Sequence, residues 1–430
     1  MIAEQSAEKI QESLEQEWDD LLIKYRAYLA QGLNLNMARG KPSPEQLGLA
    51  TPMLRLLQTE NDCFAEDGED CRNYGGAEGL PEMRAFFAQM LGVAADDVIV
   101  GGNSSLNLMF DTIATAMLRG FGGHAPWGQQ KNIKFLCPCP GYDRHFGITE
   151  YFGIEMVQVP MLETGPDMGL VEQLVEQDSS IKGIWCVPKY SNPLGITFSD
   201  ETVRRFASLR PAAADFKIFW DNAYCVHNLS DTPDILLNLM EECKKQGNDD
   251  LPILFTSTSK ITFPGAGVAA MAGSKNTLRL LRERLAYQTI GPDKLNQLRH
   301  LRFLRDTDGV ATVMAQHKTV LAPKFDIVLH ALQKHLNGIA HWTKPHGGYF
   351  ISVDVADGCA KRVVDLCAKA GVTLTTAGAT FPYGNDPKDC NIRLAPSFPS
   401  MNELQQAMEV FCTATKLAAA EQLLGKSVEI

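Results

Sequence analysis

Between about residues 97 and 275 the sequence alternates short β-rich runs with segments whose apolar residues recur at helical spacing. This alternation constrains the fold most, because strands that alternate with helices favour a mainly parallel sheet with helices on both faces. We therefore predict a doubly wound α/β sheet. The predicted strands are DVIV, IKFLCP, EMVQVP, IKGIWCVP, KIFWDN, PILFT and VAAMAG, and the predicted helices span residues 103–119, 168–177, 200–209 and 232–246.

The pattern changes after this region. Long helices are predicted at residues 275–289 and 299–336, followed by a short α+β stretch that contains GGYFISVDV and NIRLAP. At 430 residues the chain also exceeds the range in which one hydrophobic core usually suffices. We predict a large domain at residues 55–314 and a smaller α+β domain that joins residues 1–54, with their N-terminal helix, to residues 315–430.

The composition is that of a globular protein, with 45% hydrophobic and 21% charged residues. A net charge of -11 with scattered basic residues argues against nucleic-acid binding. No apolar stretch reaches the length of a membrane span, and the mixed charges of the N-terminal segment are unlike those of a signal peptide. The 11 cysteines form no disulfide or metal-binding pattern. We expect a cytoplasmic protein without a bound metal.

Ligands of doubly wound sheets bind beyond the carboxyl ends of the strands, so the polar residues that follow strands are the candidate site. The segment LPILFTSTSKITFPGAG places Ser257, Ser259 and Lys260 directly after a strand. A lone lysine at such a position is ordinarily a solvated surface charge. In an apolar setting, however, a lysine can have a depressed pKa and act as a Schiff-base nucleophile.

Other strand ends carry polar residues as well. The run KIFWDNAY places Asp221 and Tyr224 at the same edge, where the acid can pair with a cationic ring nitrogen. The plainer interpretation is a capping aspartate and a core tyrosine. Asn192, in YSNPLG, is by itself only a turn residue. The run GGNSSLN lies at a predicted helix start, which favours an anion, and contributes Asn103, Ser104 and Ser105.

Taken in order, these strand ends resemble those of the fold-type I aminotransferases, which depend on pyridoxal 5'-phosphate (PLP). That family has an Asn-Pro-x-Gly turn, an Asp-x-x-Tyr strand end and a Ser-x-Ser-Lys segment at similar intervals. The resemblance extends from about Asn36 to Pro396. The segments LNMARGKPSPEQL, YSNPLG, STSKITFPGAG and GPDKLNQLRH are most similar to a divergent bacterial subgroup of aspartate aminotransferases. The implied fold is the PLP-dependent transferase fold type I.

The resemblance implies PLP as the cofactor and a role for each matching residue. Lys260 matches the lysine that holds PLP as a Schiff base and later moves a proton between substrate and cofactor. Asp221 matches the partner of the pyridinium nitrogen, which makes the ring an electron sink. Tyr224 and Asn192 match the pair that hydrogen-bonds the ring's phenolate oxygen. Tyr142, in PCPGYDRH, matches the aromatic ring that stacks on the cofactor.

Further residues match groups that bind the phosphate. Tyr74, in NYGGAEGLPEMR, matches the tyrosine that reaches the phosphate of the neighbouring subunit, which implies a homodimer with shared active sites. Many family members have an arginine eight residues after the lysine, but this chain has Val268, and Lys189 is a candidate substitute. The other matching phosphate ligands are Asn103, Ser104, Ser105, Ser257 and Ser259.

The substrates implied by the resemblance are an amino acid and a 2-oxo acid. Arg393, in NIRLAPS, matches the arginine whose planar fork binds the substrate α-carboxylate, with Asn192 beside it. Gly40, in ARGKP, matches the glycine whose backbone closes over the same carboxylate. The implied reaction converts aspartate and 2-oxoglutarate to oxaloacetate and glutamate in a ping-pong mechanism.

Several alternatives remain open at this point. Alanine or an aromatic amino acid as the donor, and PLP-dependent C–S lyase chemistry, need most of the same residues. Aspartate requires a second cation for its distal carboxylate, and the candidates are Lys41, Arg144, Lys294 and Arg299.

Two other functions fit the sequence less well. Residues 265–270 match a GxGxxA dinucleotide fingerprint, but no strand directly precedes them and VAAMAG is itself a predicted strand. A regulator built on the PLP fold usually carries an added DNA-binding domain, for which a single N-terminal helix is too short.

Overall fold

The computed structural model describes residues 2–428, and the chain forms two compact units. We call Pro44–Val320 with His346–Gly348 the sheet unit. The remaining segments, Met1–Ser43, Leu321–Pro345 and Tyr349–Ile430, form the terminal unit. The compact units meet at other positions, after Ser43 and Val320 among them. The predicted domain boundaries after residues 54 and 314 stay a prediction.

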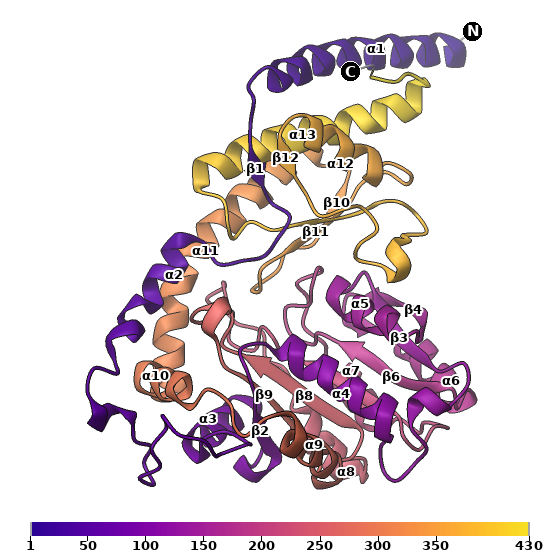
Figure 1. The fold of residues 1–430 in the computed structure, drawn as a ribbon. Helices are drawn as coiled ribbons and strands as arrows, with labels where there is room; N and C mark the ends of the chain where they lie inside the picture. Colours follow the sequence, from indigo (N-terminus) through magenta and orange to yellow (C-terminus); the bar gives the residue numbers. More distant parts are fainter. Residues whose placement is uncertain (1, 429–430) are drawn as a thin grey trace. The chain divides into compact units, whose positions relative to one another are not determined.

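The sheet unit is built on an eight-stranded sheet in the order β2-β9-β8-β7-β6-β3-β4-β5 (Figure 1). From β8 to β4 all neighbouring strands are parallel, whereas β9 runs antiparallel to both β2 and β8. The prediction of a mainly parallel sheet is therefore confirmed. The strands are β2 (Val98–Val100), β3 (Lys134–Cys139), β4 (Glu155–Leu162), β5 (Gly165–Pro166), β6 (Ile181–Cys186), β7 (Lys217–Asp221), β8 (Pro252–Ser257) and β9 (Ala269–Gly273).

The helices of this unit begin where side-chain oxygens can cap free backbone N–H groups. Such caps are Ser104, Asp167, Ser199, Asn238, Ser274 and Asp293. The helices are α2 (Pro44–Ala50), α3 (Pro81–Leu91), α4 (Ser105–Arg119), α5 (Asp143–Tyr151), α6 (Met168–Gln177), α7 (Asp200–Ala207), α8 (Leu239–Gln246), α9 (Lys275–Gln288) and α10 (Lys294–Leu304).

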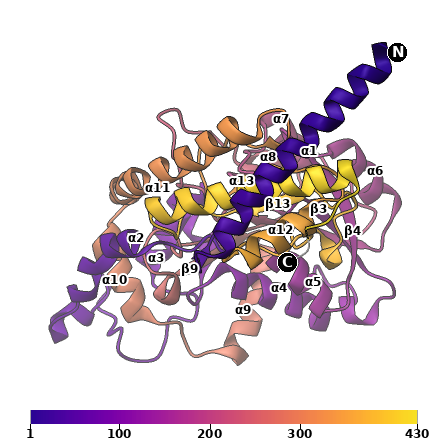
Figure 2. The same ribbon diagram turned by 90° about the horizontal axis from the view of Figure 1, so that it is seen from above.

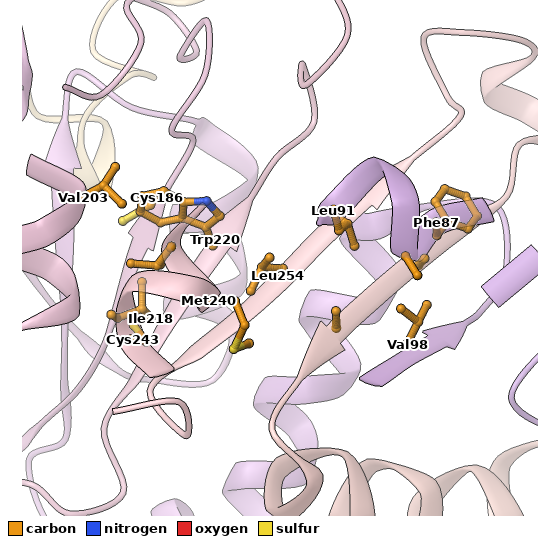
Figure 3. Packing of buried hydrophobic residues seen from close by; sticks show 14 of the residues in the cluster. Phe87, Leu91, Val98, Cys186, Val203, Ile218, Trp220, Met240, Cys243 and Leu254 are labelled. Carbon is orange, nitrogen blue, oxygen red and sulfur yellow. The ribbon is translucent and has the colours of Figure 1, made fainter. Parts of the chain in front are cut away.

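One apolar cluster joins α3, α6, α7 and α8 to a face of the sheet. Figure 3 shows Trp220 of β7 near Val203 of α7, and Phe87 of α3 near Val98 of β2. Each large side chain buried in this way contributes about 1.5–3 kcal/mol to folding. The cluster thus holds the strands in register beneath their helices.

The opposite face of the sheet carries a row of aromatic rings, because side chains alternate between the faces along each strand. Phe135, Trp185, Phe219 and Phe255 come from β3, β6, β7 and β8 in that order. Successive ring centroids lie 5.4, 4.7 and 5.8 Å apart. The row spans the strands whose ends form the site described below.

The terminal unit contains β1 (Leu35–Asn36) paired in parallel with β12 (Val372–Thr373), and an antiparallel sheet in the order β10-β11-β13. Figures 1 and 2 show α1 packed on α13, which it crosses obliquely. Its other elements are α1 (Ile2–Leu29), β10 (His341–Trp342), β11 (Ile351–Asp354), α12 (Ala360–Lys369), β13 (Asn391–Leu394) and α13 (Met401–Leu424), with the second half of α11 (Thr307–Leu336). No helix within residues 2–428 is long and apolar enough to cross a membrane.

Two predicted helices have other bounds. The helix predicted at residues 232–246 begins only at Leu239, because the preceding segment contains Pro233 and Asn238 provides the cap. The helix predicted at residues 299–336 is two helices, α10 and α11. Arg305 ends the first with a positive φ of 63°, a conformation that does not continue a right-handed helix.

A buried ion pair ties β6 to the start of β7. Nζ of Lys182 lies 2.7 Å from Oδ1 of Asp215, and Nε1 of Trp127 donates to Oδ2 at 3.0 Å. Burial alone would raise the pKa of Asp215, but hydrogen bonds from Lys182 and Gln130 outweigh it and hold this pKa below its ordinary value. Asp215 is therefore ionised, and it neutralises the buried charge of Lys182.

We expect Asp215→Asn to lower the free energy of unfolding by about 3–5 kcal/mol at neutral pH, because it leaves the buried Lys182 ammonium unpaired. Urea denaturation followed by tryptophan fluorescence measures this loss. Since the folded-state pKa is the lower one, the carboxylate stabilises fully above the unfolded-state value of about 3.9. The difference in unfolding free energy between Asp215→Asn and the unsubstituted protein should therefore become smaller as the pH falls below about 4.

Asp178→Asn is the matched control, because Asp178 pairs with Lys134 at 2.9 Å nearer the surface. This change should cost no more than about 1 kcal/mol. Equal losses in the two variants would contradict a special role for the buried pair.

Candidate active site

The carboxyl ends of β6, β7 and β8 lie side by side, because the three strands are parallel neighbours. A cavity of about 150 Å³ opens there within the sheet unit. Its walls bring together most of the residues predicted from the sequence. The polar lining consists of Ser104, Ser105, Tyr142, Asn192, Asp221, Tyr224, Ser257, Ser259 and Lys260.

Asp221 is the buried acid of this cavity, with 2% of its surface exposed. Its Oδ2 lies 3.1 Å from Nε2 of His145, with which it hydrogen-bonds. Its Oδ1 is also buried but has no hydrogen-bond partner within residues 2–428. A buried carboxylate oxygen without a donor is costly, so this atom is suited to an N–H group carried by a ligand.

His145 was missed by the sequence analysis, although it lies in the quoted segment PGYDRH, three residues after Tyr142. Its ring stacks on Trp185 at a centroid distance of 4.4 Å and an angle of 11°. The His145 ring also packs edge-to-face on the Tyr142 ring, with the centroids 4.9 Å apart and an angle of 74° between the ring planes. The aromatic row therefore fixes the orientation of the group that hydrogen-bonds Asp221. The spacing of Tyr142 and His145 on one helical face was the available signal.

Hydroxyl groups and a helix start form an anion-binding cup at the other side of the cavity. Ser104 caps α4 by accepting a hydrogen bond from the Leu106 amide at 3.2 Å. Ser257 donates to Ser259 Oγ at 3.0 Å, and Ser259 donates to the Asn103 carbonyl at 3.3 Å. The hydroxyls that follow β8 thus meet the positive end of α4, where an anion is favoured.

Val268, which stands where many family members have a phosphate-binding arginine, and Lys189, the candidate substitute, both lie outside the anion-binding cup. Val268 is 2% exposed, and its amide donates to Thr258 Oγ1 at 2.9 Å, so it closes a turn rather than facing the cavity. Lys189 donates to the Cys225 carbonyl at 3.0 Å and lines a different cavity, together with Asn222. Burial lowers the pKa of Lys189 below its ordinary value. Neither residue belongs to the cup.

Lys260 lies in the turn after β8, with Nζ 5.9 Å from the centroid of the Tyr224 ring. His227 packs edge-to-face on Tyr224, with ring centroids 5.6 Å apart. Burial, with the nearby charges of His317 and Lys260, lowers the pKa of His227 to about 3, so the ring is neutral. His227 therefore supports the ring of Tyr224. The sequence analysis did not single it out.

Gly40 and Arg393 belong to the terminal unit, where both approach Phe350. A Cβ on Gly40 would lie 2.5 Å from Cζ of Phe350, so no side chain fits at position 40. The Arg393 guanidinium carbon lies 4.8 Å from the centroid of the Phe350 ring, and Arg393 pairs in register with Ser352 on β11. The structure thus brings the two predicted carboxylate ligands together around one aromatic ring.

Tyr74 does not line the cavity. It is 79% exposed, and its carbonyl accepts a hydrogen bond from Lys294 at 3.3 Å. Lys294 is buried and forms an ion pair with Glu69, so its charge is already balanced. Of the other cations considered for a distal carboxylate, Lys41 lies 3.8 Å above the ring of Phe398.

The remaining two of these cations belong to the sheet unit. Arg144 is exposed on α5. Arg299 donates a hydrogen bond to Asn296 Oδ1 at 3.0 Å.

Comparison with known proteins identifies the family. Residues 10–427 match the family model described as aspartate amino-transferase. The chain belongs to this aminotransferase family. It is 44% identical over 406 residues to the aspartate aminotransferase of Corynebacterium glutamicum, and the match covers 94% of each chain. A crystal structure of an aspartate transaminase from the same organism superposes with a TM-score of 0.92 at 44% identity, covering 96% of this chain and 97% of that one.

A more distant structure shares the fold alone. The α-aminoadipate aminotransferase of Thermus thermophilus, solved as a complex with N-(5'-phosphopyridoxyl)-L-leucine, superposes with a TM-score of 0.74 at 20% identity, and the match covers 93% of this chain and 95% of that one. The predicted PLP-dependent transferase fold and the resemblance to aspartate aminotransferases are confirmed. The protein is a PLP-dependent aminotransferase, which acts on amino acids and 2-oxo acids.

The dinucleotide-binding alternative is excluded by local structure as well as by family. Gly265 lies in the short 3-10 helix Pro264–Ala266, and β9 begins at Ala269. The fingerprint instead requires a strand before its first glycine and a helix after it.

We expect His145→Phe to keep the stacking on Trp185 but to remove the hydrogen bond to Asp221. The cofactor-free protein should then lose about 1–3 kcal/mol of unfolding free energy, the usual cost of an unsatisfied buried polar group. Urea denaturation measures this loss. His124→Gln, at an exposed histidine after α4, is the control and should be neutral. Unchanged stability of the phenylalanine variant would show that Asp221 does not depend on His145.

Proposed function

We propose that the protein transfers the amino group of L-aspartate to 2-oxoglutarate, giving oxaloacetate and glutamate, with PLP bound in the cavity of the sheet unit. The observation that carries the proposal is the meeting of Lys260 with a buried, half-satisfied Asp221 and a hydroxyl-lined helix start in one cavity. The aspartate aminotransferase from Corynebacterium glutamicum, at 44% identity, supports the choice of substrate.

The groups in the cavity fit PLP in their chemistry. Oδ1 of Asp221 can accept a hydrogen bond from the ring nitrogen, the cup can donate to the phosphate, and the Lys260 amine can hold the cofactor covalently. PLP, when bound, supplies an electron sink for bond changes at the substrate α-carbon. Three separate features of the cavity therefore agree on one cofactor.

Each side of the cavity has its own task in this proposal. Asp221 keeps a proton on the ring nitrogen, and His145 holds the carboxylate in place for it. The Lys260 amine would move the proton at the substrate α-carbon. Tyr224 and Asn192 donate to the ring's phenolate oxygen. The Tyr142 ring covers the cofactor and excludes water.

The phosphate in this proposal is bound by Asn103, Ser104, Ser105, Ser257 and Ser259. Ser104 and Ser105 stand at the first turn of α4, where unpaired backbone N–H groups add to the hydroxyl donors. The carbonyl of Asn103 holds Ser259 in the cup. Several neutral donors thus share the negative charge.

For the substrate, Arg393 binds the α-carboxylate together with Asn192 and the backbone at Gly40. Burial of Arg393 against Phe350 favours this assignment, because a desolvated guanidinium binds a carboxylate more strongly than an exposed one. Tyr74 reaches the phosphate of a second subunit. Its high exposure in a loop held by Lys294 agrees with such a role in a homodimer.

We expect the purified protein to be yellow, to bleach when aspartate is added and to recover its colour with 2-oxoglutarate. Lys260→Ala should lower turnover by at least about 10³-fold, because the covalent attachment and the proton transfer are both lost. Absorption spectra and oxaloacetate formation measure the two effects. Lys275→Ala, at the exposed start of α9, is the control. A colourless protein that does not respond to added PLP would defeat the proposal.

The amino donor is tested separately with 2-oxoglutarate as the acceptor. We expect kcat/KM for aspartate to exceed the values for alanine and phenylalanine by about 10- to 150-fold, since a charge-paired distal carboxylate contributes about 1.5–3 kcal/mol. Higher activity with alanine or phenylalanine would support transamination but contradict aspartate as the amino donor. Release of pyruvate and ammonia without transfer would indicate a lyase.

A further inference from the structure

The anion-binding cup has no cation from its own turn. Val268 belongs to the buried apolar cluster, so the position eight residues after Lys260 cannot supply charge. A Cβ on the preceding residue, Gly267, would lie 3.2 Å from the Asn103 and Phe263 carbonyl oxygens, which leaves little room for a side chain. Any cation that adds to the neutral donors around the phosphate therefore comes from another element.

Helix α10 packs against this turn through Asn296. Its Nδ2 donates to the carbonyls of Ala266 and Gly267 at 3.0 and 2.9 Å. A Cβ added to Gly267 would lie 3.2 Å from the Asn103 carbonyl oxygen, so this glycine stands close to the group that accepts the hydrogen bond of Ser259. Asn296 thus links α10 to the rim of the cup.

Arg299 stands one turn after Asn296 on the same helix. Its Nη2 donates to Asn296 Oδ1 at 3.0 Å, so the guanidinium lies at the side chain that touches the turn. Its Nε is buried and makes no hydrogen bond within the described chain. No carboxylate of residues 11–428 forms an ion pair with it. Arg299 is therefore a partly buried cation with an unused donor, held by Asn296, the residue that binds the turn at 266–267.

We infer that Arg299 binds the cofactor phosphate in place of the arginine that the family carries at the position of Val268. The inference rests on the proposed function, since it assigns a ligand to the phosphate of PLP. A guanidinium suits this task because its planar set of N–H donors matches phosphate oxygens. Two of the other candidate cations, Lys189 and Lys294, already bind the Cys225 carbonyl and Glu69, respectively.

The test compares PLP with pyridoxal, which lacks the phosphate, in binding to the full-length protein freed of cofactor. We expect Arg299→Gln to weaken PLP binding about 10- to 100-fold, as expected for a charged hydrogen bond, and to leave pyridoxal binding unchanged. Absorption and tryptophan quenching at equilibrium give both affinities. Arg302→Gln is the control on the same helix, because Arg302 binds Leu56 and Asp62 instead. It should alter neither affinity.

The outcomes separate this inference from the proposed function. Equal weakening of PLP and pyridoxal would show a purely structural role for Arg299 and overturn the inference, as would an unchanged affinity for PLP. If Arg299→Gln does not fold, Arg299→Lys replaces it and should retain pyridoxal binding while losing part of the PLP affinity. An unsubstituted protein that binds neither compound would instead overturn the proposed function.

Discussion

The parallel alignment of β6, β7 and β8 is the constraint on which the cavity depends. Parallel neighbours end at the same edge of a sheet, so residues far apart in sequence meet there without any long loop. Asn192, Asp221 and Ser257 each follow or close one of these strands. The antiparallel strand β9 then returns the chain beside β8, and Val268 closes the turn that holds Lys260.

The electrostatics of the cavity depend on packing beneath it. Asp221 is a buried carboxylate whose surroundings satisfy one oxygen through His145 and leave the other for a ligand. His145 keeps this orientation because its ring lies flat on Trp185. A polar contact at the site is thus fixed by apolar contacts in the core, where side chains have little freedom to rearrange.

The sequence predicted the sheet and most of the cavity because the relevant signals are local. A polar residue directly after a β-rich run marks a strand end, and Lys260, Asp221 and Asn192 were all found in this way. His145 of α5 was missed because its partner, Asp221 of β7, lies 76 residues away in the sequence, and the spacing from Tyr142 does not reveal that contact. The break at Arg305 was missed for a related reason, since a positive φ at arginine has no signature in the sequence.

The aromatic row has a consequence for how this protein can change over evolution. Phe135 contacts Trp185, Trp185 carries His145, and His145 holds Asp221. A change of volume at Phe135 therefore shifts His145, which lies two contacts away and hydrogen-bonds Asp221. Substitutions along the row should be strongly non-additive, because each ring contacts its neighbours. The interior of β3 contributes nothing to the chemistry directly. Packing nevertheless couples it to the active site, so a change at Phe135 is tolerated only together with its neighbours.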